Sequence, residues 1–548
     1  MFEEEIKKRA FQNAYDHKGK ADLKSVVGKV LGDIPELRKT PKDAMDAIKV
    51  QVEYVNSLSF DQISEIVARD YPDLMNKEKK NEEHHLPDLE GVTGRVVMRL
   101  APSPSGPLHI GHTRMSILND EYVKRYGGDL ILRLEDTNPA NIDPDAYTMI
   151  PEDLKWLGVN VTKIVIQSDR FQIYYDEARK LIEMGKMYIC RCDKEEFRKS
   201  KLASVPMPDR ENDPEKNMEL FDGMLDGKFE PGEAIAVVKT DLRHPNPSVR
   251  DWIAFRIINE THPRTGDRYH VYPMMSFSVA MDDHLLGLTH VLRGKDQLTN
   301  TEKQKYIFEY NNWKRPYYYH YGMIRIPGTI LKTSAMKKGI KAGLYDSWSD
   351  IRLGTVRAME RRGYLPETFR RYWINSGLRE IDAEFSWAIF NSINRELIDP
   401  SAYRFSFVSD PKKIEMLRSP GLKSYLPYHP SFKDFGIRQY DVKDEVFISR
   451  KDEDSIKNGE RFRLKDLCYL IKNGDQYFYD GTDMREKTKI INWCPEGSRP
   501  FKIYRPDGNV DEGIIEPLSA GYRGVSQLER YGYVNFYDSD DYAYFLHD

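Results

Sequence analysis

The chain is poor in cysteine, with only four among its 548 residues: Cys190, Cys192, Cys468 and Cys494. So few thiols cannot brace a chain of this length with disulfides, which favours a reducing compartment. The amino-terminal stretch MFEEEIKKRA is charged and has no apolar core, which argues against a secretory signal. No apolar run approaches the length of a membrane span. These absences predict a cytoplasmic protein with no membrane contact.

An excess of charge of one sign is also missing. The net charge is −4, which neither requires nor excludes a nucleic-acid partner. Arginines are locally concentrated between Arg352 and Arg379, where they alternate with Tyr364, Tyr372 and Trp373. On charge alone, a solvated helix face explains this pattern better than an RNA-binding surface. Hydrophobic residues make up 40% of the chain, which is enough for real cores. The length predicts about three or four domains.

The first part of the chain, residues 1–88, has the apolar periodicity of a separate helical module. A charged stretch, Asn76–His85, then predicts a linker. The expected helices lie near Glu3–Ala14, Leu23–Leu31, Pro41–Ser57 and Phe60–Tyr71.

The remaining segments differ in pattern, and together they predict a multidomain protein with α/β, all-α and all-β parts. Strands and helices alternate in residues 89–192 and 251–330, which predicts a parallel sheet covered by helices. The lysine- and proline-rich stretch 193–250 interrupts them as an insertion, and residues 331–399 are mainly helical. Residues 400–548 have short strands typical of a β-barrel or sandwich. Their turn signals are Asn473-Gly474, Asp480-Gly481 and Asp507-Gly508.

The most informative run is RLAPSPSGPLHIGH, from Arg99 to His112. It lies between a strand-like stretch, Arg95–Ala101, and a helix-like segment that has apolar residues at Ile117, Leu118, Tyr122 and Val123. Asp129–Leu134 predicts the next strand, so the run is the loop of a βαβ unit. Unpaired N–H groups and the dipole at the start of a helix bind phosphate.

His109 and His112 flank Gly111 in this run, and the missing side chain of the glycine lets a flat base approach. Two imidazoles at a helix start can donate hydrogen bonds to a phosphorane-like transition state and stabilise it electrostatically. The alternative is that they simply cap the helix or lie satisfied in a core.

With five further motifs in the same order, the chain resembles the glutamyl-tRNA synthetases. These are class I aminoacyl-tRNA synthetases, and the likeness is to their archaeal branch, which shares its body plan with the glutaminyl-tRNA synthetases. It extends over nearly the whole chain. The motifs are LRLEDTNP (Leu132–Pro139), VRDWIAFRI (Val249–Ile257), MDDHLLGLTHVLRGKD (Met281–Asp296), WSDIRLGTVRAMERRG (Trp348–Gly363) and QLERYGYV (Gln527–Val534).

The resemblance implies a Rossmann-like parallel-sheet catalytic domain in residues 89–192 and 251–330. It implies an acceptor-end-binding domain inserted at 193–250 and a helical stem-contact domain with a KMSKS-like loop at 331–399. Residues 400–548 would form a β-barrel anticodon-binding domain of the glutaminyl type. The arginine-rich helices near 352–379 would then face the inside of the tRNA.

The implied reaction is ATP-dependent activation of L-glutamate to glutamyl-adenylate, followed by transfer to the 3′-terminal adenosine of tRNA(Glu). A second candidate substrate is tRNA(Gln), Mg²⁺ accompanies ATP, and the family suggests a monomer. Two rivals stay open: a glutaminyl-tRNA synthetase, and a tRNA-binding partner protein that has lost catalysis. The implied ATP-binding positions are Pro102, His109, Gly111, His112 and Ser334.

Arg99, Ser103, Glu135 and Arg293 match the amino-acid-binding positions of the family. The glutaminyl enzymes lack the arginine at 293, which can pair bidentately with a side-chain carboxylate. Glutamine is nearly isosteric with glutamate, so charge must separate the two. An ordinary structural ion pair is the alternative for Arg293.

Two further features of this pocket stay open. Bacterial relatives place a tyrosine where this chain has Met275, so either Tyr272 takes that role or the role is absent here. Glu135 and Asp136 could form an acid/base pair or a magnesium site. Contacts to the ammonium group and the ribose are preferred, because amino-acid activation needs no protein base.

The second class I signature, KMSKS, is altered in this chain. The matching stretch is LKTSAMKK, Leu331–Lys338, and Ala335 occupies the place of the expected second lysine. Lys332, Lys337 and Lys338 are the remaining candidates to hold the triphosphate, because lysine acts on phosphate as a flexible point charge. Our hypothesis is that Lys337 or Lys338 substitutes for the missing lysine, and the alternative is that both are solvated.

Cys190 and Cys192 resemble half of a zinc site, but a structural zinc needs four ligands. We therefore expect two buried thiols and predict no metal site in the protein. In the carboxyl-terminal part, Arg404, Gln527 and Arg530 match family positions that contact anticodon bases. Arginine and glutamine can make paired hydrogen bonds to base edges, although each could be a polar residue on a strand surface.

Overall fold

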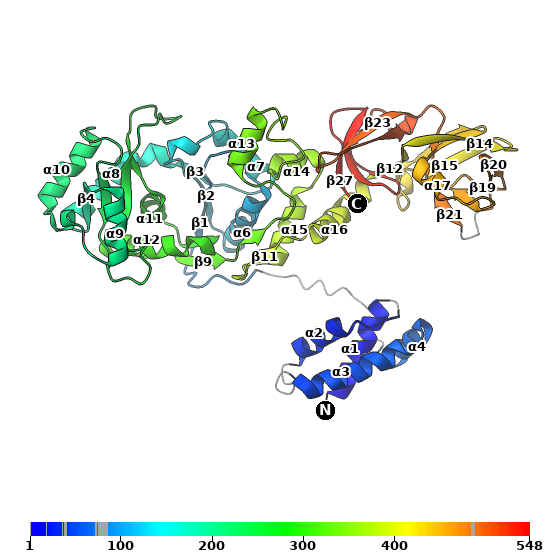
Figure 1. The fold of residues 1–548 in the computed structure, drawn as a ribbon, viewed down its shortest axis with the longest axis horizontal. Coiled ribbons are helices and arrows are strands. Elements are labelled where there is room, and N and C mark those ends of the chain that lie inside the picture. Colours follow the sequence, from blue (N-terminus) through cyan, green and yellow to red (C-terminus); the bar gives the residue numbers. More distant parts are fainter. Residues whose placement is uncertain are drawn as a thin grey trace. The chain divides into compact units, whose positions relative to one another are not determined.

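The structure is a computed structural model, and it describes residues 2–17, 19–34, 37, 41–71, 74, 86–483 and 488–548. The chain divides into two compact units, Met1–His84 and His85–Asp548 (Figure 1). The predicted linker Asn76–His85 lies outside the described residues. No helix in the described ranges combines the length and the apolar character that a membrane crossing needs.

Among its described residues, the first unit has four helices, which confirm the predicted ones to within two residues at each end. The last of them begins with a capping box, in which Ser59 and Gln62 each accept a backbone N–H of the other. Their apolar faces meet in one core that includes Phe11, Val30 and Ile48. The helices are α1 (Glu3–Asp16), α2 (Leu23–Asp33), α3 (Pro41–Asn56) and α4 (Phe60–Asp70).

The second unit is built on a parallel sheet, as the alternating pattern predicts. Strands β1 (Val97–Leu100), β2 (Asp129–Leu134) and β3 (Lys163–Ile166) pair in parallel, as do β8 (His290–Gly294) and β9 (Tyr317–Tyr321). The N–H of Thr289 donates to the carbonyl of Val97 at 2.9 Å, which places β8 beside β1. The spatial order is therefore β3-β2-β1-β8-β9. Chain order reverses at β1, and ligands bind at the carboxyl ends of strands beside such a reversal.

Helices pack on this sheet and on the antiparallel sheet that follows it in the sequence (Figure 1). The first follows the signature run directly and begins at Ile110, earlier than the apolar pattern alone indicates. The helices of this part are α6 (Ile110–Tyr126), α7 (Ala146–Trp156), α8 (Phe171–Glu183), α11 (Met275–Leu285) and α12 (Leu298–Tyr310).

A four-stranded antiparallel sheet lies between the two halves of the parallel sheet in the sequence. Its strands are β4 (Met187–Cys190), β5 (Ile235–Val238), β6 (Trp252–Ile257) and β7 (Val271–Pro273). The predicted insertion 193–250 contributes only β5 to it, together with α9 (Lys194–Ala203) and α10 (Pro214–Leu225). The limits of the sheet therefore do not coincide with those predicted for the insertion, because β6 and β7 continue its hydrogen bonding.

The expectation of two buried thiols at Cys190 and Cys192 is wrong, because these residues form a disulfide. The bridge joins residues only two apart, so it constrains the unfolded chain little. Cys468 and Cys494 are free and buried. Within the described ranges, no group of three or more metal-ligating side chains comes together.

The mainly helical region follows with α13 (Thr333–Lys341), α14 (Val356–Arg362), α15 (Pro366–Ser376) and α16 (Trp387–Ile398). Most of its arginines are engaged in contacts within the protein. Arg357 pairs with Asp153 at 2.9 Å, and Arg370 pairs with Asp120 at 2.8 Å. Buried Arg362 donates to the carbonyl of Leu546 at 2.7 Å. The segment is thus not simply a solvated helix face, since these arginines join the helices to neighbouring elements.

The carboxyl-terminal part consists of two seven-stranded, barrel-like sheets and a separate hairpin. One sheet contains β12 (Tyr403–Phe405), β25 (Gly524–Leu528), β26 (Gly532–Phe536), β27 (Tyr542–His547), β23 (Arg499–Tyr504), β24 (Val510–Ile515) and β13 (Phe407–Ser409). The other contains β21 (Lys489–Ile491), β18 (Arg461–Leu464), β19 (Cys468–Asn473), β20 (Gln476–Tyr479), β14 (Pro411–Leu417), β17 (Glu445–Ser449) and β22 (Cys494–Pro495). The hairpin is β15 (Leu422–Pro427) with β16 (Ile437–Val442). The turn predicted at Asn473-Gly474 connects β19 to β20, and that at Asp507-Gly508 connects β23 to β24.

A buried ion cluster joins the hairpin to the sheet that contains β24 and β25. Arg438 of β16 contacts Glu516 at 2.6 Å and Glu529 at 3.0 Å, and all three side chains are buried. Removing the cation would leave two carboxylates without their charge partner in a site of low polarity.

We therefore expect Arg438→Met to lower the local free energy of unfolding around β16 by about 3–5 kcal/mol. Amide hydrogen exchange of β16 and β24 measures this local free energy of unfolding. Arg450→Met is the matched control, because Arg450 and Asp410 form a pair whose side chains are 58% and 72% exposed. Such surface pairs contribute roughly 0–1 kcal/mol. Equal effects of the two substitutions would contradict a stabilising role of the buried cluster.

Candidate active site

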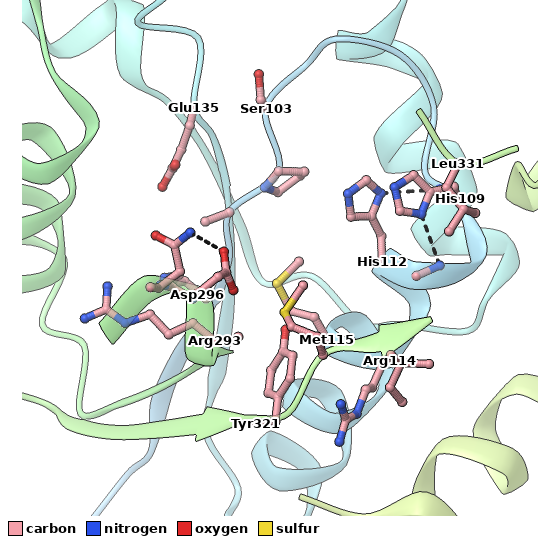
Figure 2. A pocket seen from close by; sticks show the side chains of 18 of the residues that line it. Ser103, His109, His112, Arg114, Met115, Glu135, Arg293, Asp296, Tyr321 and Leu331 are labelled. Atoms are coloured by element: carbon pink, nitrogen blue, oxygen red, sulfur yellow. Dashed lines mark hydrogen bonds between the residues drawn. The ribbon is translucent and has the colours of Figure 1, made fainter. Parts of the chain in front are cut away.

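The carboxyl ends of β1, β2 and β8 open into a cavity of about 500 Å³ (Figure 2). Arg99 comes from β1, Glu135 directly follows β2, and Arg293 comes from β8. Ser103 and Pro102 line the same cavity from the signature loop. The structure thus brings together four of the five side chains predicted to bind the amino acid, at the reversal of strand order.

Tyr272 is the fifth, and it does not line this cavity. It lies on β7 and is buried in the core of the antiparallel sheet, where its ring centroid is 5.5 Å from that of Phe171. Met275, which stands where bacterial relatives have tyrosine, does line the cavity.

The signature loop is held in place from outside the βαβ unit. The N–H of Ile110 donates to Gly354 at 2.9 Å, and the N–H of Val356 donates to Leu108 at 2.8 Å. The carboxylate of Asp153 accepts the N–H of Leu108 at 2.8 Å. The loop and the start of α6 therefore depend on the chain segment that follows α13.

His109 and His112 form the cap of α6 and also line the cavity. Nδ1 of His109 accepts the N–H of Gly111 at 3.1 Å, and Nδ1 of His112 accepts the N–H of His109 at 3.3 Å. A neutral ring whose Nδ1 accepts carries its proton on Nε2. The two rings stack with centroids 3.7 Å apart. Capping and hydrogen-bond donation, which the sequence leaves as alternatives, are therefore compatible here.

Both imidazoles are neutral at neutral pH. Burial lowers the pKa of His112 to about 4. Burial and the neighbouring His112 hold the pKa of His109 well below its usual range. Neutral Nε2–H groups can donate to developing negative charge without acting as a base.

Arg293 is a buried cation without a carboxylate partner in the described part of the chain. Its guanidinium donates to Gln304 Oε1 at 3.0 Å and to Thr301 Oγ1 at 2.6 Å, both neutral acceptors. Burial and the nearby Arg99 lower its pKa to about 10. A cation in such surroundings favours an arriving carboxylate, which would relieve both effects. An ordinary structural ion pair is not what the structure contains.

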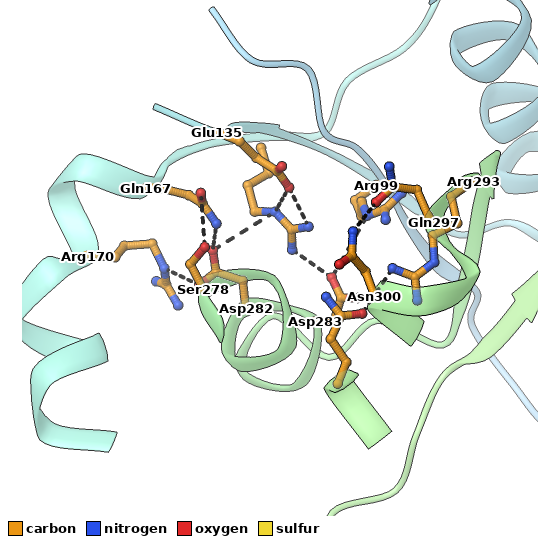
Figure 3. Close-up of polar contacts among 12 residues, drawn as sticks. Arg99, Glu135, Gln167, Arg170, Ser278, Asp282, Asp283, Arg293, Gln297 and Asn300 are labelled. Carbon is orange, nitrogen blue, oxygen red and sulfur yellow. Dashed lines mark hydrogen bonds and ion pairs between the residues drawn. The ribbon is translucent and has the colours of Figure 1, made fainter. Parts of the chain in front are cut away.

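Arg133 is the centre of an ion network with Glu135, Asp282 and Asp283, which are labelled in Figure 3. The sequence alone predicts no role for Arg133. Its side chain is fully buried and contacts Asp283 at 2.7 Å and Glu135 at 2.9 Å. Burial acts to lower the pKa of Arg133, but these carboxylates and Asp282 outweigh it and raise the pKa. Asp282 is itself held by Arg170 at 2.7 Å. One feature of the sequence could have predicted this network. Charged residues lie inside the apolar stretches DLILRL and SVAMDD, and such residues need partners when they are buried.

Glu135 lines the cavity, whereas Asp136 does not. Burial raises the pKa of Glu135, against the opposing effect of Arg133 and Arg99. The carboxylate of Asp136 is buried and accepts the Tyr147 hydroxyl at 2.7 Å and the Ser168 N–H at 2.8 Å. Those bonds leave Glu135 as the carboxylate available for an ammonium group, and they do not favour a paired acid/base or magnesium site.

The altered second signature lies against the first one. A Cβ at Gly106 would come within 2.7 Å of the Thr333 side chain, so the glycine permits this close approach. Lys337 is half-buried and pairs with Asp143 at 3.0 Å. The N–H of Asp143 donates to Pro104 of the signature loop at 2.8 Å. Lys332, Ser334 and Lys338 are exposed, and none of the candidate lysines lines the cavity itself.

The three residues predicted to read anticodon bases lie in one sheet region. Arg404 of β12 is the register partner of Gln527 of β25. The Arg404 side chain is buried, pairs with Asp399 and donates to the Ala402 carbonyl at 2.8 Å. Gln527 is half-buried, and Arg530 is exposed and donates to the carbonyl of Ile490.

Comparison with known proteins gives consistent matches. The family model of class I tRNA synthetases (E and Q), catalytic domain, matches residues 95–400, and the corresponding anti-codon binding domain matches 402–482. The glutamate–tRNA ligases of Thermoplasma volcanium and Thermoplasma acidophilum are 70% and 67% identical, each over 100% of both chains. A solved glutamate tRNA ligase from Elizabethkingia meningosepticum is similar at a TM-score of 0.42 and 20% identity, covering 56% of this chain and 70% of that one.

We expect the His112 imidazole to stay neutral until the pH falls to about 4, because burial penalises its charged form. Nitrogen-detected NMR of ¹⁵N-histidine-labelled protein measures this, with His112→Gln to assign the signal. The unfolded chain binds this proton near pH 6.5. The contribution of His112 to stability therefore falls as the pH drops from about 6.5 towards 4. A signal that titrates near pH 6.5 in the folded protein would contradict the buried, Nε2-protonated state.

Proposed function

We propose that this chain, which belongs to the class I tRNA synthetases of the E and Q group, is a glutamate–tRNA ligase. It activates L-glutamate with ATP and transfers it to the 3′-terminal adenosine of tRNA(Glu). The observation that carries the choice of amino acid is Arg293, a buried cation in the cavity whose partners are neutral. Glutamate supplies a side-chain carboxylate for it, and glutamine does not.

The rival amino acid is disfavoured on energetic grounds. Glutamine would place an amide against Arg293 and leave the buried guanidinium without a negative partner. A site built around a charged group rejects the uncharged analogue by this penalty, so no editing site is needed. The intact pair of donor histidines and Arg99 also disfavours a catalytically inactive partner protein.

In the proposed mechanism the α-carboxylate of glutamate attacks the α-phosphate of ATP, and pyrophosphate leaves. Arg99, Arg293 and Glu135 hold the charged groups of the amino acid, and Ser103 lies at the mouth of the same cavity. The Nε2–H groups of His109 and His112 donate to the phosphoryl oxygens as negative charge develops. The tRNA 3′-adenosine then takes the glutamyl group, and AMP leaves. Magnesium enters with the phosphates of ATP.

Among the lysines of the second signature, we favour Lys337 as the group that replaces the lysine missing at Ala335. Its ion pair with Asp143 places it beside the residue that contacts the signature loop at Pro104. Lys338 is exposed and is the second candidate. Lys332 directly precedes α13, and Ser334 lies in its first turn.

The other parts of the chain are proposed to hold tRNA. Residues 193–250 would contact the acceptor end, 331–399 the stem and 400–548 the anticodon, with Gln527 and Arg530 the more accessible of the predicted base contacts. Arg404 would act through its buried position beside Gln527. We further propose a monomer that works in the cytoplasm and accepts tRNA(Gln) as a second substrate, and the module 1–88 as a tRNA or partner docking element.

The lysine proposal predicts that Lys337→Ala/Lys338→Ala lowers ATP–pyrophosphate exchange by roughly 10- to 100-fold, because a charge-assisted contact to phosphate is lost. Of the single substitutions, Lys337→Ala should have the larger effect. Lys305→Ala is the control, since its ion pair with Glu309 at 3.9 Å lies on the partly exposed surface of α12. Unchanged exchange in the double variant would reject both lysines.

Charging of purified tRNA(Glu) and tRNA(Gln) with labelled glutamate, and separately with glutamine, tests the central proposal. We expect glutamate to be attached and glutamine to be rejected on both tRNAs. Arg293→Met should raise the KM for glutamate by about 100-fold or more, because a buried charge-assisted pair is lost. Charging with glutamine alone would overturn the proposal.

A further inference from the structure

Two uncharged side chains orient Arg293. Gln304 and Thr301 both lie on α12 and accept one N–H each from its two terminal nitrogens, at 3.0 and 2.6 Å. Gln304 is fully buried. The guanidinium carbon also lies 4.4 Å from the centroid of the Tyr318 ring. The guanidinium is therefore fixed in direction, while no carboxylate among the described residues forms an ion pair with it.

We infer that Gln304 and Thr301 are positioning residues that set the choice between glutamate and glutamine, by holding Arg293 with neutral acceptors only. This inference rests on the proposed function. A carboxylate at position 304 would satisfy Arg293 from within the protein. The carboxylate of glutamate would then contribute less binding free energy. The uncharged side chain of glutamine would be penalised less.

The substitution Gln304→Glu changes the charge at this position without removing a hydrogen bond. Nε2 of Gln304 is buried and has no hydrogen-bond partner among the described residues. Gln304→Glu exchanges this nitrogen for an oxygen of similar size, so it removes no hydrogen bond that the structure contains. The contact of Oε1 with Arg293 is kept, and only the charge changes.

Thr301 is held from a second side, which limits how far it can rotate. Its Oγ1 lies 2.8 Å from Nε2 of His320 and 3.2 Å from the carbonyl of Gln297, in addition to its contact with Arg293. Burial, and next Arg293 itself, lower the pKa of His320, so this neighbour also adds no charge at neutral pH. Every side chain that hydrogen-bonds to Arg293 through α12 is thus neutral, as the inference requires.

The test measures kcat and KM for glutamate and for glutamine in tRNA charging by the full chain. Gln304→Glu should raise the KM for glutamate by roughly 10- to 100-fold and change kcat much less. The ratio of kcat/KM for glutamate to that for glutamine should fall by a similar factor. Gln304→Met removes the acceptor without adding charge, so it should raise KM less and keep the ratio within about threefold of wild type.

Two further comparisons separate this role from a structural one. Asn311→Asp adds a carboxylate at the end of the same helix, where its side chain contacts the Ile307 carbonyl, and should change neither constant. Thr301→Val should raise KM, and Thr301→Ser should restore it, because only the hydroxyl is needed. The threonine pair also serves if Gln304→Glu does not fold, which its thermal melt reveals.

The outcomes are distinguishable. If wild-type enzyme charges glutamate but Gln304→Glu retains the wild-type KM and selectivity, the inference is wrong and the proposed function stands. Equal behaviour of Gln304→Glu and Gln304→Met would also reject it, since charge would then not matter. A wild-type enzyme that fails to charge glutamate would overturn the proposed function and this inference with it.

Discussion

The fully buried side chain of Arg133 is the interaction on which the rest of the site depends. It extends from β2 and meets Asp283 of α11 and Glu135, so it joins the two halves of the catalytic sheet across about 150 residues of intervening sequence. A buried guanidinium without carboxylates would be strongly unfavourable. The contact therefore holds the end of β2 against α11. The same contact fixes Glu135, which faces the cavity from the strand end.

Charge in and below the cavity is not balanced by the protein alone. In and around the network of Arg133, the arginines at 99, 133, 170 and 293 are matched in number by four carboxylates: half-buried Glu135, buried Asp282 and Asp283, and Asp296, which lines the cavity. Arg114, across the cavity, adds one more buried cation, and within the described part of the chain it donates to the carbonyls of Gly322 and Gly377. Glutamate carries one net negative charge and ATP several, so these ligands supply what is missing. Glutamine has no net charge, so its binding would leave the excess positive charge near Arg293 unbalanced.

Features that depend on neighbouring residues could be predicted from the sequence, and those that depend on distant partners could not. The four amino-terminal helices, the strand Asp129–Leu134 and the hairpin turns follow from local periodicity and turn chemistry. Arg99, Glu135 and Arg293 could be assigned to one pocket because each belongs to a recognisable motif. The roles of Arg133 and Gln304 depend on contacts that no spacing reveals. The solvated-face interpretation of the arginine-rich helices fails for the same reason, since charge along a helix does not say which carboxylates it will meet.

The neutral histidines and the surplus of cations are two consequences of one constraint. Substrates that carry this much negative charge require positive groups in the cavity, and the burial that makes those groups selective also disfavours charged imidazoles. Backbone N–H groups occupy Nδ1 of both rings, so each ring keeps a proton on Nε2 without being charged. The fixed arginines can therefore bind the ground-state charges of glutamate, while the histidines respond to charge that appears only during the reaction. In the proposed function, binding and catalysis fall to different side chains of the signature run, with Arg99 on β1 at one end and His112 on α6 at the other.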